Sequence, residues 1–238
     1  MTASILPLTL DRVRFQAGGA TIIDDVSLEV RAGRRLVVLG ANGAGKSVLL
    51  RLCHGLLEPT AGTVRWRAPA DAARARQAMV FQRPVMLRRS ALANLAYPLA
   101  KRGVARDARM AHAREVLGRV GLTALAERQA RALSVGEQQR LALARAWALE
   151  PEVLFLDEPT ASLDPSATRA VEEIVRAMHG AGTTIVMTTH DLGQARRMAE
   201  EIVFIHRGRL VERADAHAFF TAPRAPEAAA FVKGELPW

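Results

Sequence analysis

Alternating apolar and polar positions characterise the start of the chain. Residues 6–15 (LPLTLDRVRF) and 20–30 (ATIIDDVSLEV) alternate and carry β-branched side chains, with Gly18-Gly19 between them. Two such runs around a glycine pair predict an antiparallel hairpin. A short apolar run at 36–39 predicts a buried strand, and a helical run follows from about residue 46 to residue 57. Two further strands are expected at 62–67 and 78–81.

The middle of the chain changes to helical spacing. Between residues 84 and 133 the strand signals vanish, and Ala, Arg and Leu recur three or four positions apart. We therefore expect a helical subdomain at residues 83–135, inserted within a single domain that spans residues 1–238.

Strands and helices alternate after this insertion. The pattern predicts a strand at 152–157, a helix at 165–180, a strand at 183–190, a helix at 191–201, a hairpin at 202–212 turning at Arg207-Gly208, and one or two helices after Ala214. Strands that alternate with helices indicate a parallel sheet with helices on its faces. The expected fold class is therefore α/β, with a parallel core sheet, an N-terminal antiparallel β-subdomain and a helical insertion.

Composition fits an intracellular globular protein. Half of the 238 residues are apolar, which is enough for a substantial core. No run of about 18 apolar residues occurs, and the N-terminus lacks the pattern of a signal peptide, so a cytoplasmic location is expected. The single cysteine, Cys53, excludes an internal disulfide framework and a cysteine-based zinc site.

The formal charge of +9 raises the question of a nucleic-acid partner. The sequence has no homeodomain-like arm, zinc finger or aromatic RNA-binding signature. The arginines are spread along the chain, with modest clusters at 74–76, 88–89 and 106–114. We interpret most of them as solvated surface and expect no nucleic-acid partner.

A glycine-rich segment, GANGAGKS (Gly40 to Ser47), follows the strand at 36–39 and opens a helix. It fits the phosphate-binding pattern G-x-x-x-x-G-K-[ST] in the structural context that the pattern requires. The glycines let backbone N–H groups point inward, and the helix N-terminus adds partial positive charge. Lys46 is expected to reach the outer phosphates, and the Ser47 hydroxyl is placed for Mg²⁺.

Two carboxylates end the apolar run VLFLDEP. Asp157 is placed to reach the metal's water shell. Glu158 brings a second carboxylate to the same crevice, where it could activate a water for attack on the γ-phosphate. An Asp alone would suit a kinase or a GTPase, whereas the adjacent Glu favours hydrolysis.

The segment LSVGEQQR (Leu133 to Arg140) opens an alanine- and leucine-rich helix. Ser134 and Glu137 fit a capping box, which alone carries no function. Together with GANGAGKS, LFLDEP, the SLD ending at Asp164, Gln82 and the TTHD that contains His190, it occurs in the order typical of ATP-binding cassette (ABC) ATPases. The chain resembles that family over essentially its whole length.

The resemblance implies a shared nucleotide site between two cassettes arranged head to tail. Ser134, Gly136, Glu137 and Asp164 would contact the ATP held by the partner chain. Glu158, His190 and Gln82 would be catalytic, and Ser47, Gln82 and Asp157 would bind Mg²⁺. ATP would contact Phe15, Gly40, Asn42, Gly43, Ala44, Gly45, Lys46, Ser47 and Val48.

Several of these positions have plainer explanations. Phe15, which would stack on adenine, could equally be a core phenylalanine, and His190 could be a histidine packed at a strand end. Val135 stands where the family usually has glycine. We expect Val135 to keep a negative φ, because β-branched residues resist positive values, and any unusual backbone to lie at Gly136.

The resemblance also implies partners. The chain would form a homodimer on the cytoplasmic side of the plasma membrane and dock on separate permease subunits, with a substrate-binding protein outside. Docking would use exposed Met86, Leu87 and Arg88-Arg89 in the segment FQRPVMLRRSALANLAYPL. That segment is similar to those of importers for tungstate and related oxyanions. Importers of phosphate, sulfate or amino acids, and a cassette of an exporter or a lipoprotein-release system, are the alternatives.

Overall fold

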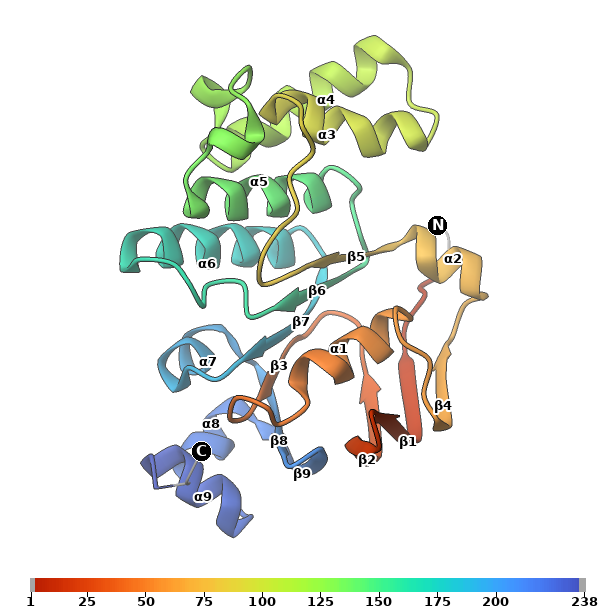
Figure 1. Cartoon of the computed structure of the whole chain (residues 1–238), viewed down its shortest axis with the longest axis vertical. Helices are drawn as coiled ribbons and strands as arrows, with labels where there is room; N and C mark the ends of the chain where they lie inside the picture. The colour runs from red at the N-terminus through yellow and green to blue at the C-terminus, as the bar shows by residue number, and fades with distance from the viewer. Residues whose placement is uncertain (1–2, 236–238) are drawn as a thin grey trace.

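The computed structural model describes residues 3–235, and a six-stranded sheet forms the centre of this part of the chain (Figure 1). The strand order is β5 (Gln77–Val80), β6 (Val153–Asp157), β7 (Thr184–Thr189), β3 (Arg35–Leu39), β8 (Glu201–His206) and β9 (Arg209–Asp215). The first five strands run parallel, and β9 pairs antiparallel with β8. The predicted α/β class with a parallel core sheet is therefore confirmed.

The core strands are buried on both faces. In β3, Val37 and Leu39 belong to one apolar cluster, whereas Leu36 and Val38 belong to another on the opposite face. Parallel strands covered by helices or a second sheet need such continuous apolar sequences.

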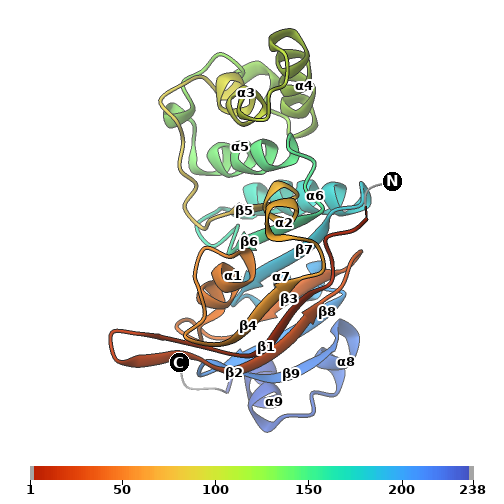
Figure 2. The ribbon, with the colours of Figure 1, turned by 90° about the vertical axis from the view of Figure 1, so that its right-hand side faces the viewer.

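A three-stranded antiparallel sheet lies beside the core, in the order β2 (Ala20–Val30), β1 (Leu8–Ala17) and β4 (Ala61–Trp66) (Figure 2). Its inward side chains share one apolar cluster with helix α1 (Lys46–His54) and with one face of the core sheet. The predicted hairpin and the predicted β-subdomain are thus confirmed.

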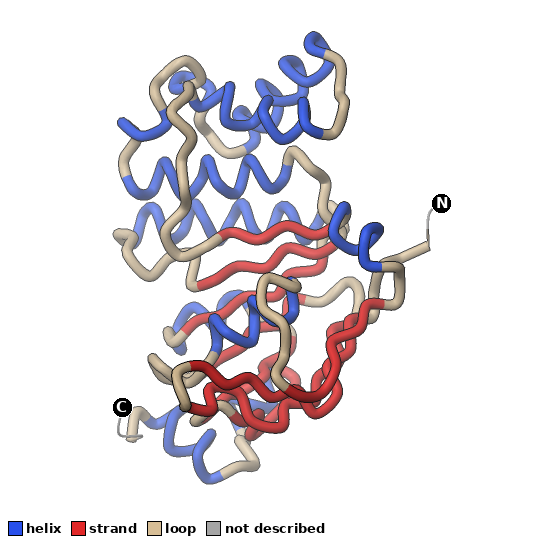
Figure 3. Tube along the Cα trace, turned by 45° about the vertical axis from the view of Figure 1, so that its right-hand side comes forward, coloured by secondary structure: helices blue, strands red, loops and turns tan. Residues whose placement is uncertain are grey.

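Helices cover the other face of the core sheet. Helices α5 (Val135–Trp147), α6 (Pro165–Gly180) and α7 (Leu192–Met198) contribute buried side chains to its apolar cluster. Helices α3 (Ala91–Lys101) and α4 (Arg106–Arg119), with short 3₁₀ turns at Thr123–Leu125 and Ala130–Ala132, lie at one end of the elongated molecule. Helices α8 (Ala216–Thr221) and α9 (Pro226–Lys233) lie at the other end. Figure 3 shows only helices and loops at the α3–α4 end.

Some boundaries differ from those predicted. Helix α1 ends at His54 because Gly55 adopts a left-handed backbone with φ 81°, so the expected extension to residue 57 is wrong. Helix α7 ends at Met198, and Glu201 begins β8 instead of closing the helix. A short helix, α2 (Ala70–Ala75), was not predicted.

The net positive charge is concentrated at the α3–α4 end. Residues 83–135 contain eleven Lys and Arg and three Asp and Glu, so they hold +8 of the chain's net +9. The arginines themselves are spread along the chain, as expected, but only in this region are they not balanced by acidic residues. In the part of the chain that the structure describes, no helix has the length and apolar character needed to cross a membrane.

Candidate functional site

The glycine-rich loop from Gly40 to Ser47 connects β3 to α1. Gly43 and Gly45 have left-handed backbones, with φ 77° and 100°, which glycine adopts without a Cβ penalty. A Cβ on Gly40 would lie 2.3 Å from the Ile205 carbonyl oxygen. Helix α1 has no side-chain cap and no acidic residue in its first turn. Its free N–H groups are therefore available to an anion.

Lys46 is a buried cation at the start of α1, with only 4% of its surface exposed. Its Nζ donates hydrogen bonds to the carbonyl oxygens of Gly40 and Ala41, both at 2.9 Å. It also forms an ion pair with Glu158 Oε1 at 3.1 Å. An ammonium group has three donors, and all three have an oxygen partner, so the charge is held at a fixed point beside the loop.

Asp157, at the C-terminal end of β6, is equally well held. Its Oδ1 accepts hydrogen bonds from Ser47 Oγ at 2.7 Å and from Thr188 Oγ1 at 3.0 Å. Thr188 lies opposite Asp157 in the parallel ladder between β6 and β7. Sequence reasoning did not identify Thr188, although the register of the two strands would have placed its hydroxyl beside the carboxylate.

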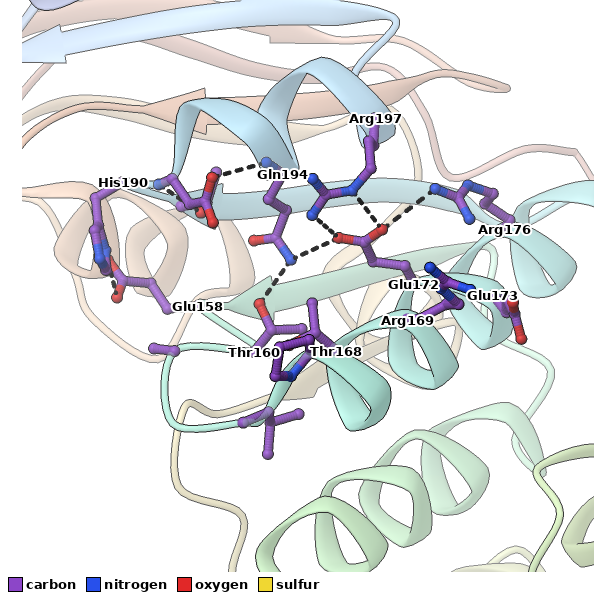
Figure 4. Close-up of a pocket in the computed structure, with 15 residues that line it drawn as sticks. Glu158, Thr160, Thr168, Arg169, Glu172, Glu173, Arg176, His190, Gln194 and Arg197 are labelled. Carbon is purple, nitrogen blue, oxygen red and sulfur yellow. Dashed lines mark hydrogen bonds and ion pairs between the residues drawn. The ribbon is translucent and has the colours of Figure 1, made fainter. Parts of the chain in front are cut away.

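Glu158 follows in a left-handed backbone conformation, with φ 43°. Such conformations are uncommon outside glycine and cost of order 1–3 kcal/mol. The Glu158 N–H donates to Thr188 Oγ1 at 2.9 Å, and its Oε2 lies 3.1 Å from His190 Nδ1 (Figure 4). The turn therefore directs two successive carboxylates to different partners: Asp157 to the Ser47 hydroxyl, and Glu158 to the Lys46 and His190 side chains.

These groups open on a hollow of about 510 Å³. The hollow is lined by Ile22, Asn42, Gly43, Gly45, Lys46, Ser47, Val48, Gln82, Glu158, Ala161 and His190. Gln82 thus reaches the site from the loop after β5. Ala44, within the loop, does not line the hollow, and its carbonyl accepts from Gly208 N at 3.0 Å. Phe15 does not line the hollow and packs, partly buried, against the apolar cluster of the antiparallel sheet.

A second hollow, of about 410 Å³, lies where α5 and α6 begin. Ser134 caps α5: Glu137 N donates to Ser134 Oγ at 3.3 Å, and Ser134 N donates to Glu137 Oε2 at 2.7 Å. Asp164 caps α6 by accepting from the N–H groups of Ser166 and Ala167. These backbone hydrogen bonds lower the pKa of the Glu137 carboxyl and of the Asp164 carboxyl. The capping box, which sequence reasoning treated as secondary, is formed.

Val135 and Gly136 are the first two residues of α5, and both have ordinary helical backbones. The expected negative φ at Val135 is therefore confirmed, and its side chain is 58% exposed. The expectation of an unusual backbone at Gly136 is wrong. A Cβ on Gly136 would instead lie 2.9 Å from Ala167 Cβ, so glycine allows α5 to approach α6 closely.

The two hollows share none of their lining residues. Lys46 belongs to the first and Ser134 to the second, so one chain does not bring these two groups into a single cavity. The hollow at α5 and α6 therefore faces outward as a separate surface with two helix N-termini and an exposed valine.

The expected docking residues are only partly exposed. Met86 is 4% exposed and belongs to the apolar core, so its predicted surface role is wrong. Its side chain belongs to the same apolar cluster as residues of α3 and α5, and its carbonyl accepts from Arg131 Nε at 3.1 Å. Leu87 is half-buried and Arg88 and Arg89 are exposed. The most exposed large apolar residue of this segment is Val85, at 68%, and Phe81 and Tyr97 are also exposed.

Comparison with known proteins agrees with this geometry. Residues 23–161 match the ABC transporter family model. A tungstate uptake system ATP-binding protein of Peptoclostridium acidaminophilum is 37% identical, over 90% of this chain and 100% of the relative. A methionine import ATP-binding protein of Nocardia farcinica is 39% identical, over 89% of this chain and 67% of the relative. A phosphate import ATP-binding protein of Natronomonas pharaonis is 36% identical, over 92% and 83%.

Two solved structures share the fold. One is cbiO1 from Clostridium perfringens, part of an ABC transporter complex, with TM-score 0.82, 25% identity and 92% of both chains covered. The other is a dimeric ATP-binding cassette in a post-hydrolysis state bound to ADP and Pi, with TM-score 0.78, 28% identity and 88% and 98% covered. With its phosphate loop, paired acids and helix-capping signature segment, the chain belongs to the ABC transporter family, as an ATP-binding subunit that hydrolyses ATP.

Proposed function

We propose that the chain powers import of tungstate or a related oxyanion through a bacterial membrane transporter, from the cytoplasmic side of the plasma membrane. The observation that carries this proposal is the match to a tungstate uptake protein over that relative's full length. The methionine import relative has similar identity, but the chain spans only 67% of it. The cargo itself would be held by an extracytoplasmic substrate-binding protein.

Within the cassette, Lys46 would hold the outer phosphates, because its charge is fixed at the mouth of the phosphate loop. Glu158 would orient the attacking water and take its proton, with His190 and Gln82 helping to position the water beside the γ-phosphate. The contact between His190 Nδ1 and Glu158 Oε2 supports this pairing. Asn42, the loop glycines and Val48 line the same hollow.

The donor set at the first hollow fits Mg²⁺. Ser47 Oγ and Asp157 Oδ1 lie 2.7 Å apart, and Gln82 lines the same hollow. Mg²⁺ prefers such oxygen donors, and it uses few protein ligands when it binds together with phosphates. When bound, the ion would neutralise charge on the phosphates.

The second hollow would serve the partner cassette of a homodimer. Ser134, Gly136, Glu137 and Asp164 would face the ATP bound by the partner chain. The two helix N-termini that open there support an anion-binding role.

Residues 83–135 would form the inserted helical subdomain of a domain spanning 1–238. This subdomain would dock on the permease through Val85, Leu87, Arg88 and Arg89.

Uptake measurements test the cargo. A strain lacking the gene should lose high-affinity tungstate accumulation, and the native gene should restore it, whereas a Lys46→Ala gene should not. Parallel measurements of methionine and phosphate uptake should show no change. Normal tungstate uptake in the deletion strain, combined with loss of methionine or phosphate uptake, would contradict the proposed cargo. Tungstate hyperaccumulation in the deletion strain would instead indicate export.

A further inference from the structure

A cleft of about 810 Å³ extends away from the catalytic carboxylate between α6 and α7. Glu158 and His190 line one end of it, and Glu172 and Arg197 line the other (Figure 4). Several of the polar side chains that line the cleft hydrogen-bond to one another. A single chain of hydrogen bonds joins α6 and α7 to the loop that follows Glu158.

Glu172 is the anchor of this chain. It is a carboxylate on α6 with only 3% of its surface exposed. Arg197 donates to it twice, from Nε at 3.0 Å and from a terminal nitrogen at 2.7 Å, and Arg176 approaches at 3.3 Å. A buried carboxylate needs such partners, and the two-pronged arginine contact fixes its orientation.

Gln194, on the first turn of α7, connects this anchor to the catalytic loop. It is 2% exposed, and its Nε2 donates to Thr160 Oγ1 at 2.6 Å. The same nitrogen lies 3.5 Å from Glu172 Oε1. Because an ionised carboxylate only accepts hydrogen bonds, Glu172 sets the orientation of the Gln194 amide, and the amide in turn donates to Thr160.

Thr160 and Gln194 lie close in sequence to the two proposed catalytic residues. Thr160 lies two residues after Glu158, and Gln194 lies four residues after His190. Asp191, which directly follows His190, caps the same helix by accepting from Gln194 N at 2.9 Å. The hydrogen bond between Gln194 and Thr160 therefore joins the backbone segments that carry the two groups facing the attacking water.

We propose that Gln194 is a positioning residue, oriented by Glu172 and Arg197, that holds the Glu158 loop at a fixed distance from His190 through Thr160. The inference rests on the proposed roles of Glu158 and His190. Without the bond, the loop and α7 can shift independently, and the contact between Glu158 and His190 loosens. Lys46 would keep its hydrogen bonds to the Gly40 and Ala41 carbonyl oxygens, so nucleotide binding should be unaffected.

A double-mutant cycle on the native dimeric cassette tests this proposal. Gln194→Leu removes the amide and keeps its size, and Thr160→Val removes the hydroxyl and keeps its shape. Each should lower kcat for ATP hydrolysis about tenfold, a barrier change of about 1.4 kcal/mol, with KM for ATP and Tm little changed. The double variant should lose no more than either single variant, because both remove one interaction. Thr160→Ser should restore kcat.

Arg169→Gln is the matched control. Arg169 lines the same cleft but makes no hydrogen bond or ion pair within residues 3–235. The Arg169→Gln variant should therefore have the same kcat as the native protein. Native kcat in both single variants, a multiplied loss of about a hundredfold in the double variant, or a lowered Tm with unchanged kcat would each overturn the proposal. Full turnover by Glu158→Gln would instead overturn the proposed catalytic role, which separates the two failures.

Discussion

At the scale of single residues, the site separates two carboxylates that are adjacent in sequence. The left-handed backbone at Glu158 directs its carboxylate to Lys46 and His190, while Asp157 stays with the hydroxyls of Ser47 and Thr188. A regular strand would also send successive side chains to opposite sides, but the turn keeps both near the phosphate loop. Binding and hydrolysis should therefore depend on different residues.

The first prediction concerns this separation. Glu158→Gln should retain ATP binding and lower the hydrolysis rate more than about a hundredfold, or at least about 2.7 kcal/mol of barrier, because the amide cannot take the proton from water. Lys46→Ala should abolish binding, since among residues 3–235 no other Lys or Arg lines the hollow. Fluorescent nucleotide titration and steady-state ATPase assays measure the two effects. Native turnover by Glu158→Gln would show that another group is the base.

The second prediction concerns the start of α5. Val135→Gly should change ATPase activity less than about tenfold, about 1.4 kcal/mol, because Val135 already has helical backbone and an exposed side chain. Gly136→Val should reduce activity far more, because even a Cβ would lie 2.9 Å from Ala167 Cβ. Steady-state ATPase assays and thermal unfolding on the assembled complex measure both.

A compensating change separates packing from nucleotide contact at Gly136. Gly136→Ala should lower Tm, and adding Ala167→Gly should recover most of the loss, because the second change reopens the space between α5 and α6. If Tm stays low in the double variant, the helix contact is not the reason for glycine at this position.

At the scale of elements, hydrophobic pattern predicted the core strands well because each is bounded by turn residues and buried on both faces. The phosphate loop and the paired acids also followed from sequence, since their geometry is local. Residues 83–90 were placed with the helical insertion, yet they form a loop that ends where Ser90 caps α3. Met86 is buried in an apolar cluster with residues of α3, α4 and α5, and such packing between distant segments is not visible in a local pattern. The Glu172 network depends likewise on how α6 packs against α7.

The third prediction concerns the capping box of α5. Glu137→Ala should lower the free energy of unfolding by about 0.5–1 kcal/mol at neutral pH, a common size for a lost cap. The hydrogen bond from the Ser134 backbone N–H lowers the folded-state pKa of Glu137 below its ordinary value of 4.5. Its contribution is thus present above that value and is lost as pH falls through the folded-state pKa. Urea unfolding at pH 7 and at pH 3 should show the difference shrinking in acid.

Glu127→Ala provides the control for that measurement. Glu127 is exposed and has no ion pair or side-chain hydrogen bond in the structure over residues 3–235. Its substitution should leave unfolding unchanged at both pH values. An equal loss for Glu137→Ala at pH 7 and pH 3 would show that the ionised carboxylate is not what stabilises the helix start.

At the scale of the whole molecule, the proposed function makes each of the two hollows one half of a nucleotide site. The first holds the cation and the carboxylates, and the second holds two helix N-termini that face outward. A second copy related by a twofold axis would supply the missing half to each nucleotide, and the twofold would create two equivalent sites. ATP would then act as part of the dimer interface.

The fourth prediction follows from that arrangement. Glu158→Gln protein should sediment as a monomer without nucleotide and as a dimer with ATP, because unhydrolysed ATP bridges Lys46 of one chain and Ser134 of the other. Analytical ultracentrifugation at several protein concentrations measures the shift. A further Ser134→Arg change should prevent dimerisation while leaving nucleotide binding intact. A monomer under both conditions would contradict the shared site.

The uneven charge distribution should orient the molecule as it approaches a negatively charged surface, before any contact forms. With +8 of its net +9 in residues 83–135, the cassette is an electric dipole whose positive pole is the α3–α4 end. A negatively charged surface exerts a torque on such a body as it diffuses closer, so the α3–α4 end arrives first. The orienting field fades within about 10 Å at 0.1 M salt. Association with such a surface should therefore slow steeply as ionic strength rises, while the dissociation rate changes much less.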